Sequence, residues 1–242
     1  MAGFASIFFR AIACAVAALF LIFSSCCVAQ KTPEWKPLTS ADLTMEAAAA
    51  DPRAPAILLY YGEERDDNRN SEFFYHRIKV LTEAGKRFGQ VELAVPPHCS
   101  LSDLQGRTVH QDGRVVEAAF NSHHSSPEQG RFTLPEVGVG SIVEYKYRVL
   151  CSGELPDAVW FLQRELYTAE EQFKLSPRKT SPNLQISYVT SNLPAGAAPK
   201  EHEEHIELNA RNIPAFAAES YMPPPENFKA EVRFFYGGRE IA

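Results

Sequence analysis

The sequence lacks the features that three common classes of protein need. No stretch combines clustered Lys and Arg with interleaved aromatics, and 24 basic residues face 30 acidic ones, so a nucleic-acid surface is disfavoured. The longest apolar run, residues 11–23, spans about 20 Å at 1.5 Å per residue, short of the roughly 30 Å that a stable transmembrane helix must cross. No Gly-rich phosphate loop is present, because Gly138-Val139-Gly140 precedes an expected strand rather than a helix.

Residues 1–29 are typical of a secretory signal peptide. Arg10 is followed by the apolar run and then by small residues up to Ala29, so we expect cleavage near Ala29 and export to the periplasm or cell surface. The alternative is lipidation of Cys26, but Phe23 stands where a lipobox usually carries Leu. Cleavage leaves 213 residues (242 minus 29) and removes one positive charge, so the net charge goes from −6 to −7. A chain of this length can bury one large core or two small ones.

Cysteine is scarce once the signal is removed. Three of the five cysteines lie within residues 1–29, which leaves Cys99 and Cys151 in the body of the chain. An even pair in an oxidising compartment suggests a disulfide between them. Two separate buried thiols remain the alternative, since a bridge needs Cα atoms within about 7 Å.

The body of the chain is expected to be mostly β. After a short predicted helix over residues 38–50, with Thr39 or Ser40 as N-cap, the hydrophobic period changes to two. Strands are predicted at residues 56–61, 73–81, 91–95, 140–150, 159–166, 184–190, 205–208 and 231–236, with a hairpin at 107–117. No helix–strand alternation suggests a parallel sheet. We therefore predict an antiparallel β-sandwich with few short helices over residues 30–222.

Three local patterns are the clearest. Asp112-Gly113 lies between β-branched residues, and Gly takes the positive φ that a hairpin turn demands. In the strand 140–150, apolar residues alternate with Glu144, Lys146 and Arg148, which predicts one buried and one solvated face. Residues 62–71 are acidic and contain Asn, and are expected to form an exposed loop.

The C-terminal part is expected to lead out of the sandwich. Residues 211–225 are Pro-rich, and few residues follow the last predicted strand. We expect residues 223–242 to form a linker and the start of a following, truncated domain.

Several stretches together resemble the N-terminal domain of unknown function found in exported bacterial proteins that carry a transglutaminase-like domain downstream. They occur in the family's order and extend from Trp35 to the end of the chain. The matching stretches are Trp35–Leu43, Tyr75–Lys86, Arg107–Glu117, Phe132–Val149, Val159–Pro177 and Asn212–Pro225. The resemblance implies a β domain outside the cytoplasmic membrane that precedes a Cys-His-Asp site. Because that downstream domain is absent from these residues, no catalytic residue can be carried over.

The candidate nucleophiles and metal ligands in the body have structural explanations. A Cys nucleophile needs a base within hydrogen-bond reach, but His98 directly precedes Cys99, and neighbours on an extended chain face opposite ways. His202 and His205 are three apart rather than four, and on a strand they would also face opposite sides. With His123-His124 they suggest a two-loop metal site, although solvated loop histidines are the favoured interpretation.

Other side chains give no sharper indication of chemistry. The aromatic rings at Tyr145, Tyr147, Trp160 and Phe161 suit a glycan groove, but their strand spacing favours core packing. The carboxylates of Glu136, Glu144 and Asp157 have no spacing that predicts a glycosidase pair.

No catalytic residue, cofactor or metal site is therefore expected. The leading hypothesis is a non-catalytic accessory domain that positions or regulates a downstream transglutaminase-like domain in cis. The alternative is a module that binds cell-envelope glycans or peptides, and a third hypothesis is metal-dependent hydrolysis.

Overall fold

The computed structural model of the protein describes residues 33–48, 51–120, 130–179, 184–217, 221–224 and 227–238. The chain divides into two compact units, Met1–Lys36 and Pro37–Ala242, and the fold described below is that of the second. The predicted signal peptide, Cys26 and His123-His124 lie outside the described residues. Within the described part of the chain, no helix is long and apolar enough to cross a membrane.

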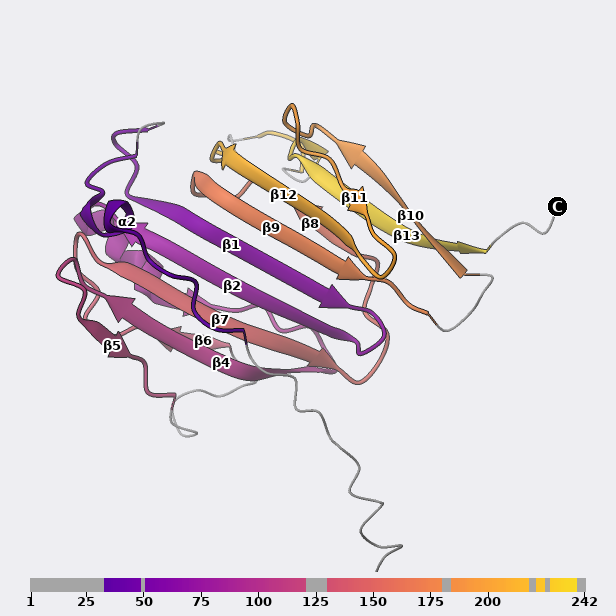
Figure 1. Cartoon of the computed structure of the whole chain (residues 1–242), viewed down its shortest axis with the longest axis horizontal. Coiled ribbons are helices and arrows are strands. Elements are labelled where there is room, and N and C mark those ends of the chain that lie inside the picture. The colour runs from indigo at the N-terminus through magenta and orange to yellow at the C-terminus, as the bar shows by residue number, and fades with distance from the viewer. Residues whose placement is uncertain are drawn as a thin grey trace, which may run out of the picture. The chain divides into compact units, whose positions relative to one another are not determined.

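An eight-stranded sheet forms the larger layer of the fold (Figure 1). In order of pairing, its strands are β11 (Lys200–Glu201), β12 (Ile206–Ile213), β9 (Thr168–Ser176), β1 (Ala56–Asp66), β2 (Ser71–Val80), β7 (Ile142–Cys151), β4 (Cys99–Val109) and β5 (Val115–Glu117). All neighbours pair antiparallel except β1 and β9, which are parallel. The chain can make this parallel pair because it passes through the other layer between β7 and β9.

A three-stranded sheet packs against this layer. It consists of β10 (Leu184–Ser191), β13 (Glu231–Gly238) and β8 (Val159–Phe161), with β13 in the middle. Trp160 of β8 is fully buried, and its ring lies 5.3 Å from that of Phe173 in β9 and 4.5 Å from that of Phe234 in β13. A separate small ladder joins β3 (Gln90–Glu92) to β6 (Arg131–Thr133). The predicted mostly β, sandwich-like fold with few short helices is confirmed.

The C-terminal strand is part of this domain. β13 pairs along its length with β10 and also with β8, and Val232 and Phe234 are almost fully buried in the core between the sheets. Glu231–Gly238 had been expected to begin a following domain. A strand that supplies the centre of the second sheet belongs instead to the sandwich, because its removal would expose Trp160.

The prediction that one face of β7 is solvated is wrong. Glu144 and Lys146 are 0% and 2% exposed. The Glu144 carboxylate accepts hydrogen bonds from Arg77, Arg107 and the Tyr75 hydroxyl, so its charge is paired within the protein. Charged residues at alternating positions therefore do not by themselves identify a solvated strand face, because such residues can be buried when they have partners on neighbouring strands.

The segment before β1 covers part of this face. α2 (Ser40–Thr44) begins at Thr39, whose side chain and that of Asp42 form a reciprocal capping box. Its end at Thr44 is earlier than the predicted helix, which reached residue 50. The Leu43 carbonyl accepts from the Lys79 ammonium at 2.7 Å, and the Pro37 carbonyl accepts from Arg77 at 3.0 Å. These bonds satisfy two buried cations from the outer side of the sheet.

Local predictions differ in outcome. The hairpin at residues 107–117 is confirmed, with Gly113 at φ 87°. The turn before β3 is a 3-10 helix, η1 (Glu83–Gly89). Much of the expected loop 62–71 is strand, since β1 runs to Asp66 and β2 begins at Ser71. β9 was not predicted.

A disulfide joins β4 to β7. Cys99 and Cys151 are opposite each other in the antiparallel ladder, with Cα atoms 4.0 Å apart, and 52 residues of sequence separate them. The bridge lies at the end of both strands, and neither sulfur is a free thiol.

Candidate functional site

Between the two sheets lies a cluster of ionisable side chains, centred on Arg164 in the connection between β8 and β9. Its guanidinium carbon lies 3.4 Å from the centre of the Tyr61 ring. Its Nη1 atom donates to a carboxylate oxygen of Glu171 at 2.7 Å and to the Leu162 carbonyl at 3.0 Å. Arg164 is thus held by a ring from β1, a carboxylate from β9 and a backbone carbonyl of its own connection.

Two carboxylates of this cluster are poised between their charged and neutral forms at neutral pH. Burial raises the pKa of Glu171 to about 7, against the opposing attraction of Arg164. Burial likewise raises the pKa of Glu63 to about 7, although the Tyr61 hydroxyl donates to it at 2.6 Å. Glu171 is fully buried whereas Glu63 is partly exposed, so the argument from burial is stronger for Glu171.

His76 completes the cluster as a neutral imidazole. Its ring stacks on Tyr145 at 4.5 Å and meets Tyr61 edge-on at 5.0 Å. Burial, reinforced by the positive charge of Arg164, lowers the pKa of His76 to about 3. Its Nδ1 atom has no hydrogen-bond partner among the described residues. The cluster therefore combines an arginine, two carboxylates that titrate near neutrality and an uncharged histidine.

The sequence contained only a weak indication of this cluster. Glu63 lay in an expected loop, and Glu171 lay in a strand that was not predicted. Charged residues are usually assigned to solvent in an alternating pattern, whereas here they point inward and bond to other buried side chains. Their spacing could have indicated them. Tyr61, Glu63 and Arg65 occupy alternate positions of a strand that continues into the acidic segment, so they share one face.

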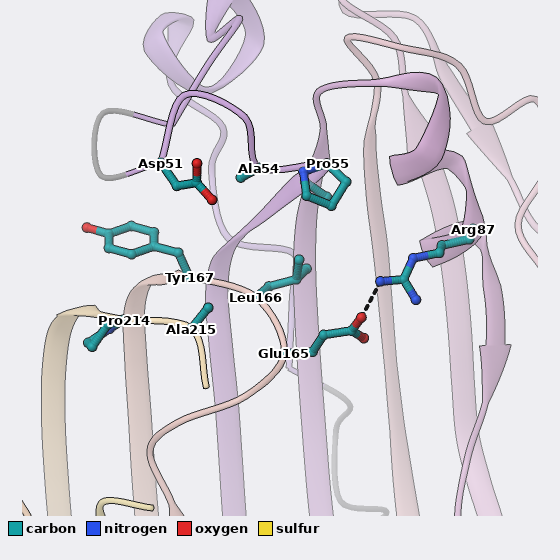
Figure 2. Close-up of a pocket in the computed structure, with 10 residues that line it drawn as sticks. Asp51, Ala54, Pro55, Arg87, Glu165, Leu166, Tyr167, Pro214 and Ala215 are labelled. Carbon is teal, nitrogen blue, oxygen red and sulfur yellow. Dashed lines mark hydrogen bonds and ion pairs between the residues drawn. The ribbon is translucent and has the colours of Figure 1, made fainter. Parts of the chain in front are cut away.

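A surface pocket of 420 Å³ lies at one end of the large sheet (Figure 2). Because β1 and β9 run parallel, and β2 and β12 run antiparallel to them, four connections meet at this end. The lining residues are Asp51, Ala54, Pro55, Ala56, Arg87, Glu165, Leu166, Tyr167, Pro214 and Ala215. An ion pair between Arg87 and Glu165 lies at one side of an otherwise largely apolar wall.

The pocket and the buried cluster share one loop. Arg164 points into the cluster, while the next three residues, 165–167, line the pocket. The Arg164 carbonyl also accepts from the Phe216 amide at 2.8 Å, and the Tyr167 hydroxyl donates to Asn212 at 2.6 Å. None of Glu63, His76 and Glu171 lines this pocket. Its own charged groups can bind a ligand, but the titrating carboxylates are separated from it.

The candidates from the sequence fall in separate places. Tyr145, Tyr147 and Trp160 are buried in the core, so they do not floor a surface groove. Glu144 lies on the opposite face of its strand from Tyr145. Glu136 lies near the 107–117 hairpin, where it pairs with Arg114 at 2.9 Å.

His202 and His205 do not face opposite sides as predicted. They flank a tight turn between β11 and β12, in which the His202 amide donates to the His205 carbonyl at 2.8 Å. Their rings stack at 4.6 Å. Facing positions of a hairpin place side chains on the same side, so the rule for residues three apart on a single strand does not apply.

The fold and these sites together define a mostly β, sandwich-like domain with a buried ionic cluster. The chain belongs to the family described as "Domain of Unknown Function with solved-structure structure (DUF3857)", which matches residues 66–217. The predicted resemblance to a domain of unknown function is confirmed at this level. The chain has no match among curated proteins.

A solved structure is similar to the fold. It is the crystal structure of a candidate protease from Parabacteroides distasonis ATCC 8503, with a TM-score of 0.59 and 15% sequence identity. The match covers 74% of this chain and 40% of that one, so the present chain corresponds to less than half of that protein. At this identity the similarity concerns the fold alone.

Proposed function

We propose that this chain is a non-catalytic accessory domain of an exported protein, and that it positions or regulates a transglutaminase-like domain in cis. The observation that carries this proposal is the burial and mutual pairing of its ionisable groups. Glu144 is held by Arg77 and Arg107 on the covered outer face of the large sheet, and Glu171 is held by Arg164 between the sheets, rather than in an open cleft. Such pairs suit a rigid scaffold more than an enzyme that must admit a substrate.

Two further observations support the same function. The fold recurs over 40% of a longer chain that is described as a candidate protease. The ordered stretches from residue 35 onward resemble proteins with a transglutaminase-like domain downstream. Export would follow from the predicted signal peptide at residues 1–29, and it places the disulfide in an oxidising compartment.

The first test is the coding sequence beyond Ala242. A Cys, His and Asp set there supports the proposal, and a stop codon directly after Ala242 contradicts it. The second test is to compare the longer protein with a form that lacks residues 30–238. This deletion ends at Gly238, so that β13 is removed together with the sheet to which it belongs. We expect loss of activity, or a lower melting temperature, of the remaining domain. Unchanged activity and unchanged stability would refute an accessory role.

A second candidate function is binding of a cell-envelope peptide or glycan in the pocket of Figure 2. The observation that favours it is the Arg87–Glu165 pair beside an apolar wall, because an ion pair can exchange partners with a charged ligand. Pull-down with purified peptidoglycan tests this function. Arg87→Ala should reduce binding. The neighbouring Lys86 pairs with Glu83 outside the pocket, so Lys86→Ala should leave binding unchanged. Equal effects of the two substitutions would indicate non-specific charge attraction.

A further inference from the structure

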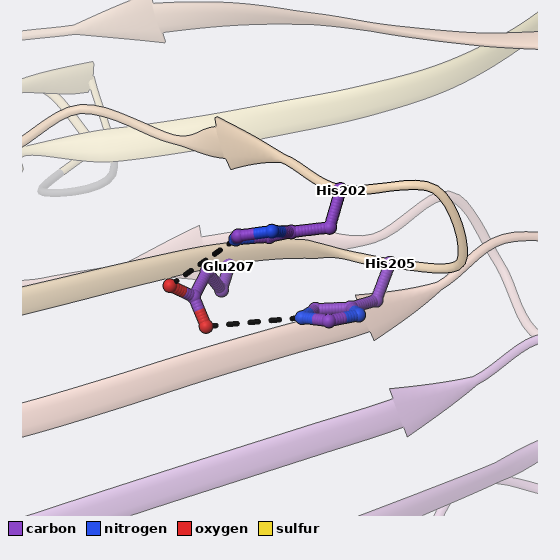
Figure 3. Close-up of side chains that lie close together, drawn as sticks. All are labelled: His202, His205 and Glu207. Atoms are coloured by element: carbon purple, nitrogen blue, oxygen red, sulfur yellow. Dashed lines mark ion pairs between the residues drawn. The ribbon is translucent and has the colours of Figure 1, made fainter.

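The hairpin between β11 and β12 holds three metal-ligating side chains together. Lys200 pairs with Glu207 and Glu201 with Ile206 in the ladder, and the bond from the His202 amide to the His205 carbonyl closes the turn. This geometry fixes the backbone at both histidines. Glu207 is the second residue of β12, two residues beyond His205, and its carboxylate lies on the same side of the hairpin as the two rings (Figure 3).

The three side chains converge at their ligating atoms (Figure 3). Nε2 of His202 lies 3.3 Å from one carboxylate oxygen of Glu207, and Nε2 of His205 lies 3.8 Å from the other. One ligand atom from each of the three residues lies within 4.8 Å of the others. The two rings stack with an angle of 19° between their planes, so both present Nε2 to the same carboxylate.

These separations are close to those of a zinc site. Zinc takes histidine nitrogen and carboxylate oxygen at about 2.0–2.2 Å in a tetrahedron, which places neighbouring ligands about 3.3–3.6 Å apart. The 3.3 Å contact already fits, and the others need closure by about 1.5 Å at most, which small rotations of these exposed or partly exposed side chains can supply. Two histidines and one carboxylate are also a ligand set that zinc uses when it keeps a position open to water.

The charges around the three ligand side chains are mixed, so the site depends on the convergence of the ligand atoms. Glu201, Glu203 and Glu204 lie in or beside the turn. Lys179 is paired with Glu204 at 3.0 Å, and Lys200 and Lys174 lie opposite Glu207 on the two neighbouring strands.

We propose that His202, His205 and Glu207 form a surface site for a divalent transition metal such as Zn²⁺, with the remaining coordination open to solvent. The site is independent of the pocket and of the buried cluster. It lies on the β11–β12 hairpin at an edge of the large sheet, where a bound ion and its open position are accessible.

Isothermal titration of the chelator-treated protein with ZnCl₂ at pH 7.5 tests the proposal. We expect one ion per chain. His202→Ala and His205→Ala should each weaken binding by at least about tenfold, because each removes a direct ligand, and the double variant should abolish it. Glu207→Gln should also weaken binding, because it removes the charged carboxylate ligand.

The matched control is His98→Ala, which removes an exposed histidine far along the chain from the hairpin and should leave binding unchanged. Circular dichroism of each variant without zinc confirms that the fold is retained, which is expected because the substitutions lie on a partly exposed hairpin. Absence of stoichiometric binding overturns the proposal. Binding that survives in the His202→Ala, His205→Ala double variant also overturns it.

Discussion

Replacement of Glu171 by Gln should remove part of the pH dependence of stability. In the folded protein, burial raises the pKa of this carboxyl from its ordinary 4.5 to about 7, so the folded state holds a proton that the unfolded chain releases. The contribution of this proton to the unfolding free energy has its full value below about pH 4.5. It is lost as the pH rises toward and beyond 7, because the folded state must then bury a charge.

The size of the effect follows from the pKa difference. A difference of about 2.5 units corresponds to about 3.4 kcal/mol at 1.36 kcal/mol per unit. Relaxation around the charged form reduces this, so we expect the unfolding free energy of the unaltered protein to fall by about 1–3 kcal/mol between pH 5 and pH 8 on account of Glu171. Glutamine resembles the protonated acid and still offers an oxygen to Arg164, so Glu171→Gln should be more stable than the unaltered protein at pH 8 by a similar amount.

Urea denaturation at several pH values between 5 and 8 measures this difference. The matched control is Glu170→Gln, which removes the same charge from the adjacent position, where the side chain is 40% exposed and pairs with Arg211. The control should follow the pH profile of the unaltered protein. If Glu171→Gln and Glu170→Gln have the same profile, the buried carboxyl does not titrate near neutrality and the reasoning fails. In that case, a titration of the Glu171 carboxyl monitored by carbon-13 NMR would measure its pKa directly.

Three further predictions concern other parts of the chain. Arg164→Ala should lower the unfolding free energy by about 3–5 kcal/mol at pH 8 in urea denaturation, because it leaves a buried carboxylate unpaired; a loss below 1 kcal/mol would contradict this. The double variant Cys99→Ser, Cys151→Ser should lose about 2–5 kcal/mol, and a reducing agent should destabilise only the unaltered protein. Mass spectrometry of the exported protein should show a new N-terminus directly after Ala29, whereas a lipid-modified Cys26 at the N-terminus would refute that cleavage site.

The fold class could be predicted because it depends on the period of apolar residues. The strand 140–150 and the hairpin at Asp112-Gly113 are both present, and each depends on interactions within a few residues. The parallel pairing of β1 with β9 could not be predicted. It joins segments about 110 residues apart, and nothing in either segment specifies its partner.

The candidate sites were harder to predict because their side chains come from separate strands. The buried cluster needs Glu63 on β1, His76 on β2 and Glu171 on β9, and only the sheet order makes them neighbours. The prediction that His202 and His205 face opposite sides was wrong for a different reason. Their spacing was interpreted for a straight strand, while residues 202–205 form a turn that places the two rings face to face.

The charged residues on the two faces of the large sheet are difficult to place from the sequence for one physical reason. Alternation of polar and apolar residues identifies a strand, but it separates buried from exposed positions only when every charge must face water. On β7, Glu144 meets Arg77 and Arg107 from neighbouring strands, so its charge is neutralised in place. On β9, Glu171 meets only Arg164, one of its oxygens has no partner among the described residues, and its pKa rises to about 7. Glu171 is therefore the buried carboxylate of these two strands on which a change of pH will act.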